Sequence, residues 1–231
     1  MKTLKDKLNE SLVGGKNEMF NGNDKTLIEP WIKENYEIYG TLKIYEDKYG
    51  FVVDSDDNVE VANKNIKSLT NGMFRWGEIA SGFDCSKCTK LISLEGAPKK
   101  CDDFYCPNCT GLISLEGVPN ECNNFDCSGC VRLRSLEGVP NKCYSFDCSG
   151  CTGLKSLKGA PQLVSDWFDC SGCTKLRSLE GAPSRCSEFY CPYCTDLRSL
   201  EGAPMSATIK CSECTNLTIT DDDRKKYKIK S

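Results

Sequence analysis

The chain contains no histidine among its 231 residues. Histidine is the commonest general base and the commonest metal ligand in proteins, so its absence argues against an ordinary enzyme. It also removes the partner that usually activates a catalytic cysteine. We therefore predict a non-enzymatic protein without catalytic residues and without a cofactor.

The sequence also lacks a run of about 18 apolar residues, which argues against a membrane-spanning helix. The first ten residues carry charge but no apolar stretch of the kind found in secretory signals. The formal net charge is only -3, which gives no global case for binding nucleic acid or a membrane. These absences favour a cytoplasmic protein whose thiols stay reduced.

Cysteine, by contrast, is abundant, with 18 residues that all lie in or beside one repeated phrase. The phrase is Phe-Asp-Cys-Ser-Gly-Cys-Thr-x-Leu-x-Ser-Leu-Glu-Gly-Ala-Pro, and successive copies begin 20 to 22 residues apart. A nearly constant step of this size is typical of a solenoid, in which each copy forms one coil that packs against its neighbours. The seven copies begin at Phe83, Phe104, Phe125, Phe146, Phe168, Phe189 and Ile209.

The apolar spacing within each copy resembles that of the leucine-rich repeat. From Cys101 to Leu115 the pattern is Cys-x-x-Phe-x-Cys-x-x-Cys-x-x-Leu-x-x-Leu, with phenylalanine and cysteine where leucine is usual. The Ser-Leu-Glu-Gly-Ala-Pro phrase is similar to that of short-repeat, cysteine-rich proteins of gut bacteria and their phages. The resemblance implies a leucine-rich-repeat solenoid that carries a parallel β-sheet on its concave face and serves as a binding scaffold.

We divide the chain into four segments, and the expected fold class is α/β to mainly β. Residues 1–40 should form an N-terminal helical segment, with one helix carrying Leu4, Leu8 and Leu12 and a second helix over 26–35. Solenoids need caps because an end coil otherwise exposes its core and its strand edge. We expect a divergent β cap at 41–82 (a hairpin at 41–53, then a strand at 59–61), seven coils at 83–219 and a C-terminal cap with a short helix at 220–231.

The cysteines fall into three rows. A strand row and a turn row are present in every copy, whereas small residues replace the third row in some coils. We interpret the strand row as small buried apolar side chains, and the turn row as small side chains that meet backbone groups. The strand row is Cys85, Cys106, Cys127, Cys148, Cys170, Cys191 and Cys211; the turn row is Cys88, Cys109, Cys130, Cys151, Cys173, Cys194 and Cys214; the third row is Cys101, Cys122, Cys143 and Cys186.

A metal site or redox array is the alternative interpretation of the strand and turn rows. Cys85-x-x-Cys88 and Cys106-x-x-Cys109 are separated by 17 residues, within the range of a four-cysteine zinc pattern, and an iron–sulfur cluster would use the same ligands. The repeat period produces this spacing by itself, so we favour packing over zinc. Disulfides are a further alternative, which the reducing cytosol and the orientation of thiols on parallel strands oppose.

The outward residues of the strands form the expected concave sheet, which is the usual binding surface of a solenoid. Acids interleaved with tyrosine and tryptophan suit a basic or amphipathic protein segment, because aromatic side chains supply binding energy and acids steer the partner. The alternative is a solvated face whose aspartate is only a copied consensus residue. The candidate partner-binding residues are Asp84, Tyr105, Asp126, Asp147, Trp167, Asp169 and Tyr190.

Two further patterns have simpler explanations. A basic column along the turns is followed three residues later by a mostly acidic column, and we predict a ladder of surface ion pairs rather than an RNA site. Asp54-x-Asp56-x-Asn58 resembles the opening of a calcium loop but lacks its later glycine and glutamate, so we predict a turn. The basic column is Arg134, Lys155, Arg177 and Arg198.

Overall fold

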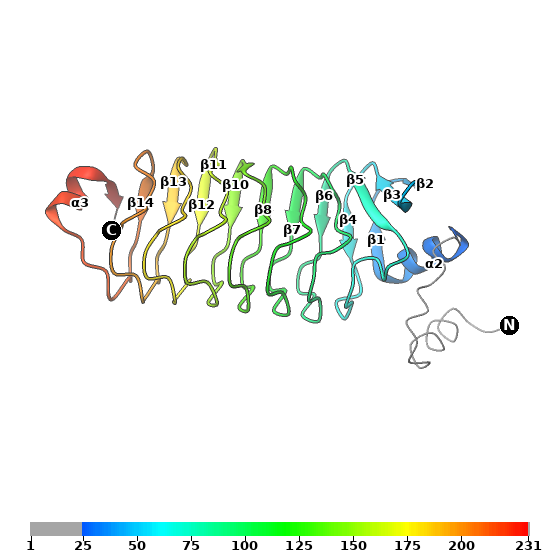
Figure 1. Ribbon diagram of the computed structural model, residues 1–231, viewed down its shortest axis with the longest axis horizontal. Helices are drawn as coiled ribbons and strands as arrows, with labels where there is room; N and C mark the ends of the chain where they lie inside the picture. Colours follow the sequence, from blue (N-terminus) through cyan, green and yellow to red (C-terminus); the bar gives the residue numbers. More distant parts are fainter. Residues whose placement is uncertain (1–24, 231) are drawn as a thin grey trace.

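The computed structural model describes residues 25–230, and they form a β-solenoid. Parallel coils stack in chain order from one end of an elongated molecule to the other (Figure 1). The expectation of stacked coils in a mainly β fold is therefore confirmed. The helix predicted around Leu4, Leu8 and Leu12 lies outside the described residues.

One ten-stranded sheet runs the length of the solenoid, because each coil contributes one short strand to it. All neighbouring pairs are parallel except β1 with β4, which is antiparallel. The register aligns equivalent residues, so Phe83 pairs with Phe104 and Phe104 with Phe125. In sheet order the strands are β1 (Tyr36–Ile38), β4 (Val59–Val61), β6 (Gly82–Asp84), β7 (Asp103–Tyr105), β8 (Asn124–Asp126), β10 (Ser145–Asp147), β12 (Trp167–Asp169), β13 (Glu188–Tyr190), β14 (Thr208–Lys210) and β15 (Lys228–Lys230).

The core is a ladder of equivalent apolar side chains. Six phenylalanine rings, from Phe83 to Phe189, stack with centroids 5.2 to 5.8 Å apart and interplanar angles of 7 to 21°. Offset stacking at this distance adds to the free energy of burying the rings. Two leucines in each full coil, such as Leu112 and Leu115, are completely buried behind the ring. The repeated sequence therefore becomes a repeated packing unit.

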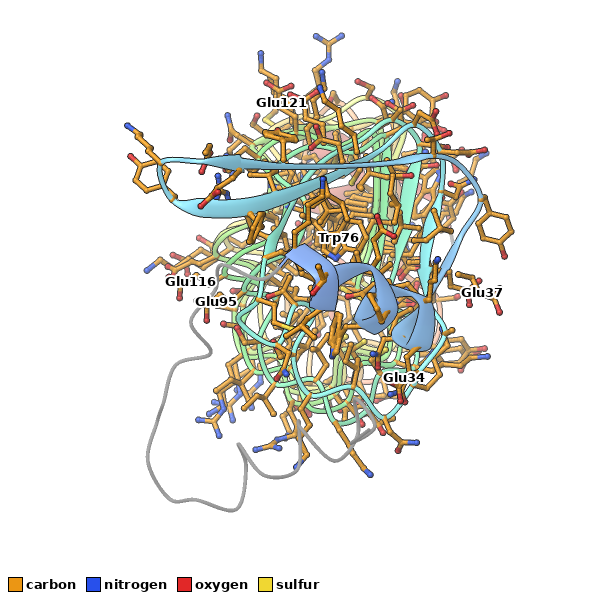
Figure 2. All side chains as sticks on the ribbon, turned by 90° about the vertical axis from the view of Figure 1, so that its right-hand side faces the viewer. Glu34, Glu37, Trp76, Glu95, Glu116 and Glu121 are labelled. Carbon is orange, nitrogen blue, oxygen red and sulfur yellow. The ribbon has the colours of Figure 1, made fainter. Side chains whose placement is uncertain are left out.

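At the N-terminal end, helix α2 (Lys25–Asn35) and three more strands close the stack. The predicted hairpin is confirmed as β2 (Leu42–Asp47) and β3 (Gly50–Ser55), and the predicted second helix and the strand at 59–61 are confirmed as α2 and β4. Strand β5 (Arg75–Ile79), which pairs with β3, was not predicted. Trp76 lies inside the coil cross-section (Figure 2) and packs edge-on against Phe83 at 5.8 Å.

At the C-terminal end, α3 (Asp221–Lys226) is the predicted short helix. The Thr220 hydroxyl accepts a hydrogen bond from the Asp223 backbone N–H, and the Asp223 carboxylate accepts one from the Thr220 N–H, so the first turn is capped. Tyr227 is buried, and β15 then adds an unpredicted last strand to the sheet. Two short strands, β9 (Lys142–Cys143) and β11 (Leu163–Val164), pair on another edge of the coils. In the described part of the chain, no helix combines the length and the apolar character needed to cross a bilayer.

Candidate functional site

The sheet register places ten outward residues in one row along the solenoid. Six of the seven candidate residues lie in this row, and Trp167 lies beside it, two positions before Asp169 on β12. The sequence analysis missed Glu37, Glu60 and Lys230, because β1, β4 and β15 lie outside the seven copies. The alternation Val59-Glu60-Val61 could have placed Glu60, since an outward position between two inward valines is visible in the sequence. From β1 to β15 the outward row is Glu37, Glu60, Asp84, Tyr105, Asp126, Asp147, Asp169, Tyr190, Lys210 and Lys230.

The middle of the outward row holds three carboxylates on adjacent strands. Asp147 pairs in register with Asp126 on one side and with Asp169 on the other. Like charges directly opposite each other destabilise a sheet. Burial raises the pKa of Asp147 to about 6 against the hydrogen bonds from Ser149, which lower it, and the two neighbouring carboxylates make a smaller contribution in the same direction as burial. The row therefore stores electrostatic repulsion at its centre.

The aspartates also have a local structural role. Asp126 and Asp147 each accept a hydrogen bond, through Oδ1, from the backbone N–H two residues later, with a donor–acceptor distance of 2.8 Å. Asp84 and Asp169 accept the same bond at 2.7 Å. This bond fixes the turn that follows each strand. The alternative interpretation was that the aspartate is only a repeated consensus residue. It has a physical basis, because the aspartate side chain stabilises the turn.

The two tyrosine coils support this explanation. Where Tyr105 and Tyr190 replace the aspartate, Pro107 and Pro192 stand two residues later. Proline has no backbone N–H to donate, so an aspartate would have no partner there. Aspartate and its N–H donor are therefore lost together, which indicates that the two positions form one unit.

The aromatic candidates differ in the contacts that they make within the molecule. The Tyr190 hydroxyl bonds to Glu188, and the Lys210 ammonium lies 4.3 Å from the Tyr190 ring centroid and 2.8 Å from the Glu188 carboxylate. Tyr190 is therefore held within the molecule. Tyr105 and Trp167 are half-buried, and neither makes a ring–ring or cation–π contact with the described residues. Burial, followed by the nearby Asp103 carboxylate, raises the pKa of Tyr105 to about 12.

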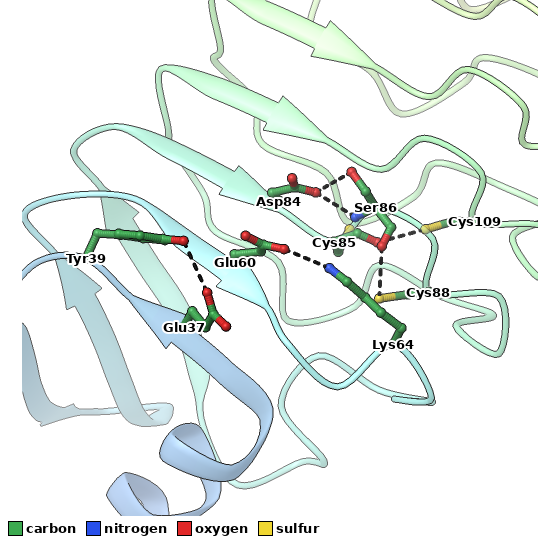
Figure 3. A network of polar contacts seen from close by, with 9 residues as sticks. All are labelled: Glu37, Tyr39, Glu60, Lys64, Asp84, Cys85, Ser86, Cys88 and Cys109. Carbon is green, nitrogen blue, oxygen red and sulfur yellow. Dashed lines mark hydrogen bonds and ion pairs between the residues drawn. The ribbon is translucent and has the colours of Figure 1, made fainter.

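Figure 3 shows the N-terminal end of the outward row. The Lys64 ammonium lies 3.1 Å from the Glu60 carboxylate, and the Tyr39 hydroxyl donates to Glu37 at 3.2 Å. Asp84 lies on the next strand, where it holds its own turn. Carboxylates therefore continue from β12 to β1, interrupted by Tyr105.

The turn-row cysteines form a hydrogen-bonded ladder between coils. Six of the seven thiols donate to the backbone carbonyl oxygen of the strand-row cysteine in the preceding coil. This confirms that the turn row meets backbone groups. Cys88, in the first coil, instead lies 3.8 Å from the Ser86 carbonyl oxygen. The Sγ–O distances are 3.0 Å for Cys109 (Figure 3), 3.3 Å for Cys130, 3.1 Å for Cys151, 3.2 Å for Cys173 and Cys194, and 3.0 Å for Cys214.

The strand-row thiols are buried, as predicted, and burial raises the pKa of Cys127, Cys148 and Cys170. All 18 cysteines are free thiols rather than disulfides. Between residues 25 and 230, no three cysteine or carboxylate side chains are arranged to hold a metal ion. The zinc and iron–sulfur alternatives therefore have no assembled ligand set in this part of the chain.

Cys214 differs from the other turn-row thiols. It is half-buried at the last repeat coil, whereas the remaining 17 cysteines are buried. A hydrogen bond with the Cys191 thiol lowers the pKa of Cys214 to about 7. Cys214 therefore combines a lowered pKa with partial access to solvent.

The predicted ladder of ion pairs along the turns is wrong. In the described chain the four residues of the basic column make no ion pair, and the turns hold only Lys158 with Glu137, at 3.2 Å between two exposed side chains. Glu95 and Glu116 project from the side of the coils opposite Glu37 (Figure 2).

The residues that resemble a calcium loop are used by the backbone. Asp54 lies at the end of β3 and accepts from the Glu78 N–H at 3.0 Å. Asp56 and Asn58 lie in the bend that follows, and they accept from the N–H groups of Thr41 at 2.5 Å and Gly82 at 2.8 Å. These side chains therefore connect the N-terminal hairpin to the first coils.

Comparison with protein-family models, with curated proteins and with solved structures finds no match for this chain. The function of the protein is therefore inferred from the side chains of the outward row and of the turns. The row offers fixed carboxylates with half-buried aromatic side chains among them, and it holds no nucleophile paired with a base.

Proposed function

We propose that the protein is a non-enzymatic leucine-rich-repeat scaffold that binds a basic or amphipathic protein segment along its outward row. The observation that carries the proposal is the central stack of Asp126, Asp147 and Asp169, in register and without a cationic partner in the described chain. A cationic segment laid along the row would relieve their mutual repulsion. We place this scaffold in the cytoplasm, where its free thiols stay reduced.

Rigid display supplies the mechanism. Adjacent strands lie about 4.8 Å apart, so the carboxylates form an array with a fixed step. The array needs no ordering when the partner arrives, because each aspartate is already held by its turn. Preorganisation of this kind increases affinity by reducing the entropy lost on binding.

Two aromatic side chains supply the remaining contact. Tyr105 and Trp167 lie near the two ends of the aspartate stack, and each is half-buried. Aromatic residues contribute strongly to binding when a partner covers them, and their faces also attract cations. A segment that alternates basic and apolar side chains matches this arrangement.

The proposal is tested by changing Asp126, Asp147 and Asp169 together to asparagine. Asparagine keeps an oxygen that accepts the turn N–H, so the fold is retained while three charges are removed. The probe is a labelled peptide of alternating lysine and leucine, about eight residues long, which spans roughly 26 Å when extended. We expect its affinity, measured by fluorescence anisotropy, to fall at least about tenfold.

A matched control separates this effect from net charge. Changing Glu95, Glu116 and Glu180 to glutamine removes the same three charges from exposed turn positions. This control should retain the affinity of the unchanged protein within about twofold. Equal affinity for all three proteins, or equal loss in both variants, would rule out binding at the outward row.

A further inference from the structure

A second surface, formed by the turns of the middle coils, has the opposite charge to the outward row. It encloses a hollow of about 450 Å³ and contains four cations and two aliphatic side chains. We name it the basic groove. Its lining residues are Ile113, Val131, Arg132, Arg134, Gly153, Lys155 and Lys175.

Close packing of the coils creates the hollow. A Cβ atom at Gly153 would lie 2.3 Å from the Leu133 carbonyl oxygen, so a side chain at this position would require the neighbouring turn to shift. The equivalent residue two coils earlier, Gly111, is restricted in the same way, at 2.5 Å from the Leu91 carbonyl oxygen. Arg132 occupies the same position in the coil between them, so neither neighbouring coil has a side chain at the equivalent position. The guanidinium therefore borders an open space.

The cations of the basic groove have no counter-charge among the described residues. Arg132, Arg134, Lys155 and Lys175 are exposed, and none of them makes an ion pair within residues 25–230. Four like charges around one hollow repel one another and attract anions. Guanidinium groups bind carboxylates and phosphates through paired hydrogen bonds. The positive charge of the groove thus favours binding of an anionic partner.

The aliphatic side chains decide which anionic partner fits. Ile113 is 52% exposed and Val131 is 42% exposed, so both can bury apolar surface when the groove is filled. A single-stranded nucleic acid would use aromatic side chains on which to stack its bases, and the groove is lined by none. We propose that the basic groove binds an acidic protein segment that carries aliphatic side chains among its carboxylates.

This surface is independent of the outward row. It is built from the turns after the strands rather than from the sheet, and its charge selects an acidic instead of a basic segment. Occupation of the groove leaves the carboxylates of the outward row exposed. The protein would then hold two segments of opposite charge on one rigid solenoid.

The test uses the whole chain and a labelled peptide of alternating glutamate and leucine. Binding is measured by fluorescence anisotropy at an ionic strength of about 50 mM, where screening is weak. The double variant Arg132→Glu with Lys155→Glu should bind the peptide at least about tenfold more weakly. Both positions are exposed, so circular dichroism should show an unchanged fold.

Two comparisons make the result specific. The double variant Lys33→Glu with Lys67→Glu gives the same change in net charge at exposed positions outside the groove, and it should bind within about twofold of the unchanged protein. Val131→Ser should weaken binding roughly threefold, because the apolar contact is reduced while the charge stays constant.

Three outcomes would overturn the proposal. The first is no saturable binding of the peptide below roughly 1 mM. The second is an equal loss of affinity in the groove variant and the control variant, which would mean that only net charge matters. The third is tighter binding of a labelled oligouridine than of the peptide, which would make the groove a site for nucleic acid.

Discussion

At the scale of single residues, one residue type has two physical roles. A strand-row cysteine such as Cys127 is a small buried apolar side chain, and its thiol has no oxygen acceptor in the described structure. A turn-row cysteine such as Cys151 donates to a carbonyl oxygen of the preceding coil. The Cys-x-x-Cys phrase therefore combines a packing residue with a hydrogen-bond donor.

These two roles predict opposite preferences for serine and alanine. Cys151→Ala removes the 3.1 Å bond to the Cys127 carbonyl oxygen and should lower the free energy of unfolding by about 1–2 kcal/mol. Cys151→Ser keeps a donor and should cost less. At Cys127 the order should reverse, with serine about 1 kcal/mol worse than alanine, because its hydroxyl would be buried among apolar groups. Urea unfolding measures all four variants, and the same order at both positions would contradict the distinction.

The sequence predicted part of this residue-level picture. The turn row was expected to meet backbone groups, because its cysteine stands at a turn position that favours a small side chain close to the backbone. The sequence could not show which carbonyl oxygen is nearest, since the bond joins two coils and depends on how they stack. The sequence contained a sign of the role of Asp126, because the pair Asp-x-Ser of some copies is replaced by the pair Tyr-x-Pro in others. That role becomes clear only when the N–H of Ser128 is seen to point at the carboxylate.

At the scale of the strands, three-residue segments such as β8 and β10 are stable only as members of a ladder. Their register is fixed on one side by stacked phenylalanines, and on the other side it aligns Asp126 with Asp147. Burial of the rings favours this register while the carboxylates oppose it. The sheet therefore carries an electrostatic cost that depends on pH.

This cost predicts that mild acid stabilises the protein. The pKa of Asp147 is raised to about 6 in the folded state, so between pH 7 and pH 5 the folded state takes up a proton that the unfolded state does not. Stability from this group is complete below the unfolded pKa of about 3.9 and is lost as the pH rises through about 6. With allowance for solvent screening, we expect a gain of about 1 kcal/mol at pH 5 over pH 7.

The Asp147→Asn variant is the control for this prediction. Asparagine does not titrate, so the difference in unfolding free energy between pH 7 and pH 5 should shrink by the contribution of Asp147. Groups that titrate elsewhere in the chain affect both proteins equally. An identical pH dependence for the two proteins would mean that Asp147 does not carry the effect.

Most predicted elements lie where the sequence shows a period or a repeat, although the five-residue strand β5 was missed. The hairpin over β2 and β3 has alternating positions on both sides of a turn, and α2 has apolar residues at helical spacing. Strands β1 and β15 are only three residues long and include charged residues such as Glu37 and Lys228. Their sequence alone does not favour a strand. They form because the edge of the existing sheet offers unpaired backbone groups.

At the scale of the whole molecule, the solenoid is closed by different structures at its two ends. The N-terminal end is covered by aromatic packing, in which Tyr36 and Trp76 both contact Phe83. The C-terminal end is covered by α3 and β15, with Tyr227 buried beneath them. Coils in the middle contact only their neighbours, so the structures at the two ends determine how much of the core is exposed to water.

We predict that removing residues 220–231 destabilises the protein and promotes association. The deletion removes Tyr227 and β15, which exposes the edge of β14 and the apolar side chains of the last coil, including Ile209. Burial of this apolar surface is worth about 2–4 kcal/mol, and open strand edges pair with other chains. Thermal unfolding should show a lower midpoint, and sedimentation should show oligomers.

A milder change in the same segment gives the control. Lys225→Gln removes the exposed ion pair with Asp222, where the two side chains lie 3.1 Å apart. Exposed pairs of this kind contribute little, so stability should change by less than about 0.5 kcal/mol. A truncated chain that stays monomeric and as stable as the full chain would contradict the role of the C-terminal cap.

The period predicted the overall architecture because every copy has the same packing pattern. The surface charges were harder to predict. The turn columns of opposite sign suggested an ion-pair ladder, yet Arg134 and Lys155 have no acidic partner in the described chain. The spacing in the sequence gives the number of residues between two charged side chains. Only the coil geometry shows whether they point toward each other.

The stacked, equivalent coils have a consequence for how such a gene can change. Because each interface repeats the one before it, unequal recombination between copies can add or remove a whole coil without altering any remaining contact. Each event would change the length of the molecule by about 4.8 Å. The step of 22 residues between Phe146 and Phe168 shows that smaller insertions are accommodated outside the ring stack, which continues across it at 5.3 Å. The architecture therefore allows the length of the molecule to change in units of one coil.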